Sequence, residues 1–287
     1  MPDKREHPGP PDPRGPVRAK GGSAGSTAGR AAAPRSKAPG PRQPGSGAGS
    51  RRGEARAGQD RTREARQVQP PPDAAPGQLD LAVRRALRSL VPATADRVAA
   101  HLVATAALLD SDPAAALAQA RAARAFAPRI AVVREAVGLA AYAAGEWQEA
   151  LAELRAERRM SGSAVHLPVM ADCERGLGRP ERAIALATEE SSGLDEAGRI
   201  EMLIVAAGAR QDLGQLDAAV VMLGDAADRA RPRPWSARLW YAYAEALLAA
   251  GRTAEARTWF EATADVDDGE TDAEERLVSL TEPPTRS

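Results

Sequence analysis

The sequence predicts an all-α fold, an α-solenoid of about five helix-turn-helix repeats with a capping helix at each end. Three observations indicate this. Apolar residues recur at helical spacing from residue 78 to about residue 280, and no stretch alternates apolar and polar residues over the length of a strand. Small residues also return at a period close to 34. We therefore expect residues 77–280 to form one helical repeat domain.

The alanine-rich segment SDPAAALAQARAARAFAPR, residues 111–129, is expected to form the second helix of such a repeat. Asp112 is a suitable N-cap, Pro113 fits the first helical turn, and Pro128 closes the segment. At helical spacing one face carries only small residues, which are Ala116, Ala120 and Ala123. The unit is therefore a helix, a tight turn, a second helix and a proline.

The same unit recurs when the turn residues are aligned. The turn residues are Ser111, Gly145, Gly178, Gly214 and Gly251, at intervals of 34, 33, 36 and 37 residues. Five residues after each of them stands an alanine, and these are Ala116, Ala150, Ala183, Ala219 and Ala256. Seven residues before each stands a small residue, and these are Ala104, Gly138, Ala171, Ala207 and Ala244. Paired helices approach closely only where such contact residues are small.

This pattern resembles the tetratricopeptide repeat, whose period is 34 residues. In the last copy the matching residues are Trp240, Tyr243, Ala244, Gly251, Ala256 and Phe260. In the second copy they are Gly138, Gly145, Ala150 and Leu154. The middle copies depart from the signature, since Leu167 and Leu203 stand where the last copy has tryptophan. The resemblance covers residues 96–268 and implies a non-catalytic protein-binding scaffold; an alanine-rich bundle without repeats is the alternative.

In the family that the chain resembles, the first helix of each repeat lines a concave binding surface. By that resemblance the candidate partner-binding residues are Glu135, Leu139, Tyr142, Asp172, Arg175, Ile204, Gln211, Arg238, Tyr241, Glu245 and Leu248, with His101 and Thr105 in the first repeat. Apolar residues and acids mix on this face, so we expect a protein or peptide partner with apolar anchors and some basic residues. A lysine- and asparagine-rich clamp for a C-terminal carboxylate is not expected, because residues 77–287 contain neither residue type.

No catalytic, cofactor or metal site is expected. The three histidines lie far apart and make no metal-ligand spacing with Cys173, the single cysteine. The segment GSGAGS lacks the preceding strand and the following lysine of a phosphate-binding loop. We expect Cys173 to be a packed thiol, and the charge run ELRAERR, residues 153–159, to be a solvated helix face.

Residues 1–76 carry 15 basic and 7 acidic side chains, a net charge of +8, which leaves −8 for the neutral chain's remainder. This segment has no aromatic residue and few large aliphatic ones, so it is expected to be a disordered tail, as are residues 281–287. Three roles are open for it. It could be a flexible tether, a weak salt-dependent arm for nucleic acid or another polyanion, or an internal partner for the acidic remainder.

The remaining composition bears on location and origin. With one cysteine, no long apolar run and no apolar signal region, the chain is expected to be cytoplasmic and to make no membrane contact. Abundant alanine, arginine, glycine and proline without asparagine is the composition expected from a high-GC bacterium.

Overall fold

The computed structural model describes residues 63–65, 67–189, 193–227 and 232–281, and these residues contain helices and turns but no strand. The repeat pairs are α3 (Pro92–Leu108) with α4 (Pro113–Phe126), α5 (Ala131–Ala143) with α6 (Trp147–Ser161), α7 (Leu167–Gly176) with α8 (Pro180–Glu189), α9 (Glu196–Asp212) with α10 (Leu216–Ala227), and α11 (Ser236–Ala249) with α12 (Thr253–Ala264). We number these pairs repeats 1 to 5.

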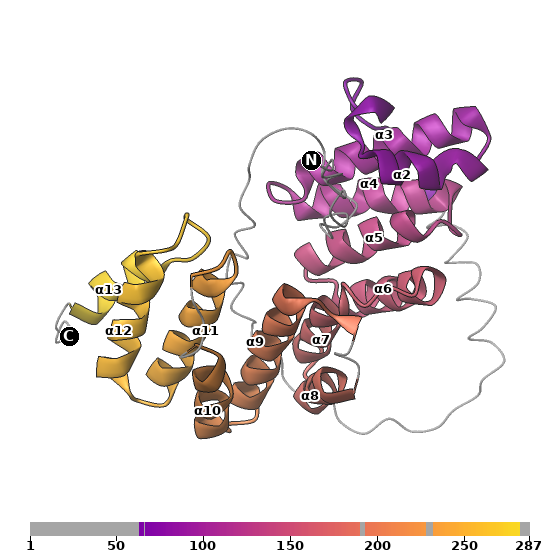
Figure 1. Ribbon diagram of the computed structural model, residues 1–287. Helices are drawn as coiled ribbons and strands as arrows, with labels where there is room; N and C mark the ends of the chain where they lie inside the picture. Colours follow the sequence, from indigo (N-terminus) through magenta and orange to yellow (C-terminus); the bar gives the residue numbers. More distant parts are fainter. Residues whose placement is uncertain (1–62, 66, 190–192, 228–231, 282–287) are drawn as a thin grey trace, which may run out of the picture.

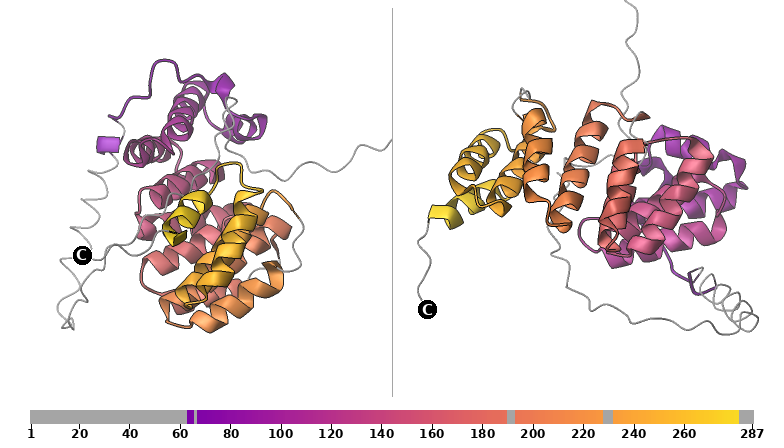
Figure 2. Two further views of the ribbon diagram at one scale, coloured as in Figure 1. Left: turned by 90° about the vertical axis from the view of Figure 1, so that its left-hand side faces the viewer. Right: turned by 90° about the horizontal axis from the view of Figure 1, so that it is seen from below.

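Additional elements lie at both ends of the repeats. The N-terminal cap is η1 (Pro76–Gln78), α2 (Leu81–Ala86) and η2 (Leu87–Ser89), and the C-terminal cap is α13 (Ala273–Thr281). The pairs stack in chain order, and each helix of the repeats packs against the next one along the chain (Figures 1 and 2). The predicted all-α solenoid is confirmed, with a shorter and more broken N-terminal cap than a single helix.

Glycine ends the first helix of repeats 2 to 5. Gly145, Gly178, Gly214 and Gly251 have φ angles between 71° and 77°, in the left-handed region that favours glycine. In repeat 2 the Gly145 N–H donates to the Tyr142 carbonyl at 3.0 Å, and the Glu146 N–H donates to the Ala141 carbonyl at 2.8 Å. Equivalent pairs of hydrogen bonds close the other three helices, so each turn is a Schellman motif.

The first repeat has no glycine at its turn, and its second helix is fixed by a cap instead. The Asp112 carboxylate accepts a hydrogen bond from the Ala115 N–H at 3.0 Å, and Pro113 is the first helical residue. The predicted N-cap is therefore confirmed.

The small positions of the repeat are buried at helix–helix contacts. All five alanines that follow the turn by five residues are 0% exposed. In repeat 2 the contact is especially tight, since a Cβ on Gly138 would lie 2.5 Å from Cδ2 of Leu154 on the partner helix. Leu154 itself is 0% exposed. The glycine is thus required for Leu154 to occupy the space between α5 and α6.

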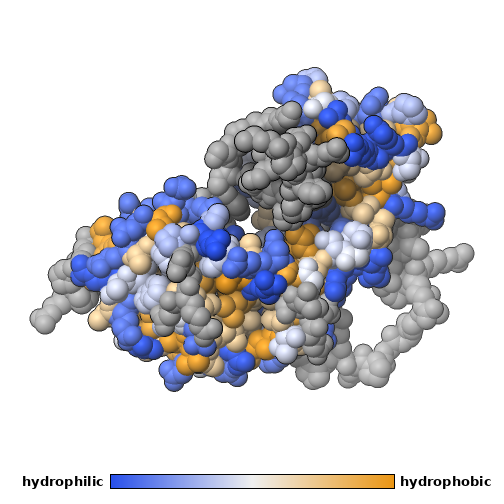
Figure 3. Space-filling view, viewed as in Figure 1, coloured by the Kyte–Doolittle hydropathy of each residue, from blue (hydrophilic) through white to orange (hydrophobic). Residues whose placement is uncertain are grey.

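Three hydrophobic clusters make up the core of the described residues, and the C-terminal one contains most of the aromatic side chains. Trp240, Tyr243 and Phe260 are buried there, as the repeat pattern predicts. Trp259 is partly buried, with its ring centroid 6.0 Å from that of Trp240 and 5.1 Å from that of Tyr243. Hydrophilic residues cover much of the surface in Figure 3, and hydrophobic residues show over α9 and α10.

The charge run at residues 153–159 is only partly a solvated helix face. Glu153 is 7% exposed and Glu157 is 5% exposed, so the prediction is wrong for these two residues. Glu153 forms ion pairs with Arg124 on α4 and with Arg134 on α5, the latter at 2.6 Å. The buried carboxylate is therefore paired with two partly exposed arginines, at the junction of repeats 1 and 2.

Part of the segment that precedes the helices lies against repeat 1. The Gln119 side-chain amide of α4 donates to the Gln69 carbonyl at 3.0 Å. The disorder expected for residues 1–62 and 282–287 falls outside the described residues, and the boundary at residue 76 stays a prediction.

Candidate partner-binding face

The first helices of the repeats approach one another directly. Contacts join α3 to α5, α7 to α9 and α9 to α11, although a second helix separates each of these pairs in the chain. The second helices of neighbouring repeats do not meet in the same way within the described residues. Because the first helices are closer together than the second helices, the solenoid curves toward them. We call the side of α5, α7, α9 and α11 that carries the candidate residues the first-helix face.

Hydrogen bonds and ion pairs connect neighbouring repeats along this face. The Glu135 carboxylate of α5 contacts Nε2 of His166, just before α7, at 2.8 Å. The Tyr142 hydroxyl donates to Asp172 of α7 at 2.7 Å, and Arg175 donates both to Asp172 and to Asp212 of α9, each at 2.8 Å. Three candidate residues, Tyr142, Asp172 and Arg175, therefore belong to one polar chain from α5 to α9.

A second group of polar contacts continues from α9 to α13. Arg238 of α11 donates to Glu201 of α9 at 2.7 Å. On the next turns of α11 the Tyr241 hydroxyl donates to Asp272, and Glu245 forms an ion pair with Arg276 of α13 at 2.8 Å. Arg238, Tyr241 and Glu245, all candidates from the sequence, thus connect repeat 5 to both of its neighbours.

The environment of these groups shifts their pKa values. Burial, together with the charge and hydrogen bond of Asp172, raises the pKa of Tyr142. Burial and the hydrogen bond to Asp272 raise the pKa of Tyr241 to about 12. Burial also raises the pKa of Glu201, and the charge of Arg238 acts in the opposite direction. Both phenols are therefore neutral at pH 7 and act as hydrogen-bond donors to carboxylates.

The apolar candidates differ in how far they are packed. Ile204 and Leu248 are half-buried against the C-terminal cluster. Leu139 is also half-buried but belongs to none of the three clusters. It lies between Glu135 and Tyr142 on one helical stripe of α5, and Gln211 occupies a half-buried position near the end of α9. Leu139 is the apolar side chain on this face with the least internal packing.

At the N-terminal end, the equivalent positions of the first repeat are covered. His101 is 1% exposed and Thr105 is 3% exposed. The His101 ring contacts the Gln119 side chain at 2.7 Å, and burial lowers its pKa. Neither residue is available to a partner.

The N-terminal cap packs against two first helices, α3 and α5. Leu79, Val83 and Leu87 share a hydrophobic cluster with Val98 of α3 and Val133 of α5. This intramolecular cover was missed by sequence reasoning, because the apolar stripe of residues 79–90 predicts a helix but not the surface on which it packs. Glu135 of α5 is itself 4% exposed, so the accessible part of the first-helix face begins at Leu139.

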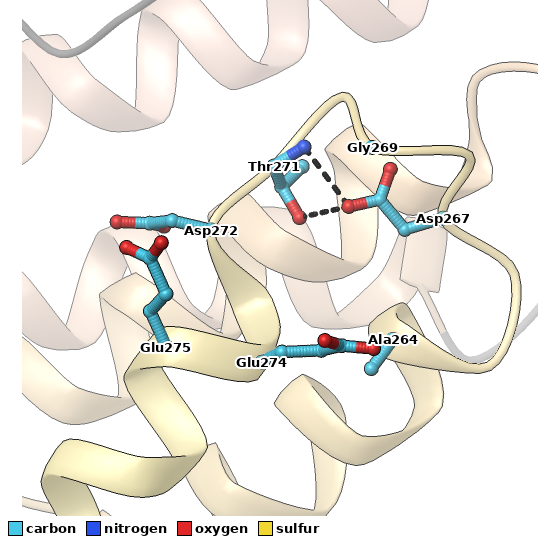
Figure 4. A pocket seen from close by; sticks show the side chains of 7 residues that line it. All are labelled: Ala264, Asp267, Gly269, Thr271, Asp272, Glu274 and Glu275. Atoms are coloured by element: carbon cyan, nitrogen blue, oxygen red, sulfur yellow. Dashed lines mark hydrogen bonds between the residues drawn. The ribbon is translucent and has the colours of Figure 1, made fainter.

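An acidic loop between α12 and α13 forms a shallow pocket lined by several carboxylates (Figure 4). The Asp267 carboxylate accepts hydrogen bonds from the N–H groups of Glu270 at 2.7 Å and Thr271 at 2.9 Å. The Asp272 carboxylate accepts from Tyr241. Among the described residues, no group of three or more His, Cys, Asp or Glu side chains is arranged to hold a metal ion. The loop carboxylates stabilise the turn and the start of α13.

Cys173 is a packed thiol, as predicted, since it is 0% exposed and burial raises its pKa to about 12. No described helix is long and apolar enough to cross a membrane.

Residues 205–275 match the model of the family described as Tetratricopeptide repeat. This range begins within α9 and ends within α13, so it includes repeat 5, the copy with the clearest signature in the sequence. The same helix pairing and the same glycine turns extend back to repeat 2, beyond the matched range. No curated protein matches the chain.

Proposed function

We propose that this tetratricopeptide repeat protein is a non-catalytic scaffold that binds a polypeptide partner along its first-helix face. Tetratricopeptide repeats are generally protein-interaction modules. The observation that carries the proposal is the row of first helices in which α7, α9 and α11 pack on one another and the Tyr142–Asp172 hydrogen bond joins α5 to α7. This row offers an extended surface with Leu139, Ile204 and Leu248 among polar groups. Such a surface suits an extended or helical segment better than a small molecule.

The charges on this face indicate the chemistry of the partner. Six carboxylates take part in its polar contacts, and these belong to Glu135, Asp172, Glu201, Asp212, Glu245 and Asp272. They are opposed by three guanidinium groups, on Arg175, Arg238 and Arg276, and by the His166 ring. The excess of negative charge favours a partner segment in which arginine or lysine lies beside an apolar anchor.

Selection of a random peptide library on the immobilised full-length protein tests this proposal. Peptides that bind the first-helix face should combine an apolar residue with a basic one. Leu139→Glu should weaken their binding about thirtyfold or more, because it places a charge where an apolar anchor is expected to pack. Met160→Glu is the matched control, since Met160 is 46% exposed near the end of α6, a second helix. If both variants bind the selected peptides like the wild type, the first-helix face is not the binding surface.

The arginine-rich tail supports a second candidate function, as a weak arm for nucleic acid or another polyanion. Full-length protein should then bind RNA or DNA at about 50 mM salt, and its affinity should fall steeply at 200 mM. A variant that lacks residues 1–62 has lost most of the arginines of the tail, and it keeps the contact between Gln69 and Gln119. If both proteins bind RNA or DNA equally, or if neither binds at low salt, the tail is not a nucleic-acid arm and the tether remains as its role.

A further inference from the structure

Each first helix directs one stripe toward the second helices on either side of it. In α11 this stripe consists of Trp240, Tyr243 and Leu247, which are 8%, 8% and 0% exposed. Their large side chains fill the space between α10 and α12, where Trp259 packs on them. These side chains therefore leave no open space between α10 and α12 on this side of α11.

Repeat 4 has smaller and more polar residues at the equivalent positions. Counted back from its turn glycine, Gly214, these are Leu203, Ala206 and Arg210 in place of tryptophan, tyrosine and leucine. The space they leave is a cavity of ≈ 320 Å³, lined by Ile184 and Ala187 of α8, Met202, Leu203 and Ala206 of α9, and Met222 of α10. We call this cavity the α8–α10 slot. Its volume lies at the small end of the range for ligand pockets.

The α8–α10 slot lies on a different side of α9 from the first-helix face. The slot residues of α9 recur at helical spacing from Arg199 to Arg210. At 100° per residue this stripe points about 130° away from Ile204 and Gln211. A ligand in the slot would not compete with one on the first-helix face.

Two arginines line the slot and have no acidic partner among the residues that the structure describes. Arg199 and Arg210 are 11 residues apart on α9, about 16 Å along the helix. Arg199 donates to the Leu194 carbonyl and Arg210 donates to the Gln215 side chain, each at 2.9 Å. Neither arginine forms an ion pair among the described residues, and Nε of Arg210 is buried without a hydrogen-bond partner there.

The other junctions on this side of the solenoid contrast with the slot. At the junction of repeats 1 and 2, Arg124 pairs with Glu149 at 3.0 Å. At the junction of repeats 2 and 3, Arg155 pairs with Glu174 at 2.7 Å. Since a buried guanidinium N–H without a partner is costly, the slot favours a ligand that brings a carboxylate.

We propose that the α8–α10 slot is a second binding site, for a polypeptide segment that inserts an aliphatic or aromatic side chain and places carboxylates against Arg199 and Arg210. The apolar lining and the cavity volume suit one large side chain. The two unpaired guanidinium groups supply the charge complementarity. This proposal is independent of the first-helix face, whose excess negative charge favours partners of the opposite sign.

Two peptides of ten residues test the proposal on the full-length protein. One carries a leucine–phenylalanine pair flanked on each side by glutamates, and the other has lysines in place of the glutamates. We expect the glutamate peptide to bind at least about tenfold more tightly in isothermal titration. Ala206→Phe, which fills the slot with a side chain like the one that α11 carries, and Arg210→Gln, which removes a charge, should each reduce this binding about tenfold or more.

Arg257→Gln is the matched control, because Arg257 is an exposed arginine on α12 whose loss should leave binding unchanged. Ala206→Phe should not lower the thermal midpoint of the protein. If it does, the loss of peptide binding is tested with Arg210→Gln alone. Equal affinity for the two peptides, or wild-type binding by both slot variants, would overturn the proposal. Self-association of the wild-type protein that both slot variants abolish would instead identify a second copy of the chain as the occupant.

Discussion

Replacement of Phe260 by alanine is expected to lower the free energy of unfolding of the C-terminal repeats by about 3–5 kcal/mol. Phe260 is 0% exposed on α12, and its ring lies edge-on to Tyr241 with 5.6 Å between the centroids. It belongs to the cluster that joins α9 to α13. Truncation would remove its apolar contacts and leave a cavity that the surrounding helices can close only in part.

The loss should be local, because each repeat of a solenoid contacts only its neighbours. Hydrogen exchange is therefore expected to quicken in α11, α12 and α13, whereas the amides of α4 and α6 keep their protection. Thr258→Ala is the control, since Thr258 is exposed on the same helix and its loss should change stability by no more than about 0.5 kcal/mol. Equal loss of protection in every repeat would contradict the local effect, and unchanged exchange would contradict the packing of Phe260.

The burial of Phe260 could be predicted from the sequence because it depends on local periodicity. A residue nine places after the turn glycine falls on the same side of the second helix in every copy, and Leu154 and Leu223 occupy the same position. All three are 0% exposed. The turn glycines of repeats 2 to 5 could be predicted for a similar reason, since helices commonly end at a left-handed residue and glycine adopts that conformation most easily.

The pairings between repeats could not be predicted in this way. The Tyr142–Asp172 and Arg175–Asp212 contacts join residues that are 30 and 37 positions apart. Helical periodicity places each on the first-helix face but does not say which side chains meet, because that depends on the crossing angle and rotamers of two different helices. The residues of the candidate face could therefore be listed from the sequence, whereas the ion pairs and hydrogen bonds that join them could not.

The α8–α10 slot was missed because it results from short side chains on three helices and not from a sequence motif. Of its α9 residues, only Leu203 was noted in the sequence, as a departure from the tryptophan of the last copy. A cavity follows only when the neighbouring residues of α8 and α10 are also too short to fill the space. The N-terminal cover of α3 and α5 was missed for a related reason, since it depends on the path of the chain before the repeats.

Glu174 is the polar residue whose burial departs furthest from expectation. It lies four places before the turn glycine, where repeat 5 has the buried Leu247, and it is itself 0% exposed. One carboxylate oxygen is 2.7 Å from Nη2 of Arg155 on α6, and the other is 3.4 Å from Nη1 of Arg179. The two arginine side chains are 44% and 46% exposed, so solvent screens each pair.

Removal of both arginines should therefore cost much more than removal of either. The Arg155→Ala/Arg179→Ala variant leaves a buried carboxylate with no cation, which is expected to lower the free energy of unfolding by about 3–5 kcal/mol. Each single variant keeps one partner and should lose about 1 kcal/mol or less. Urea denaturation followed by circular dichroism measures all three. Addition of Glu174→Leu to the double variant should recover most of the loss, because an apolar side chain needs no partner at a position where repeat 5 already has leucine. A double variant within about 1 kcal/mol of the wild type would mean that the Glu174 carboxylate obtains its stabilisation from groups other than the two arginines.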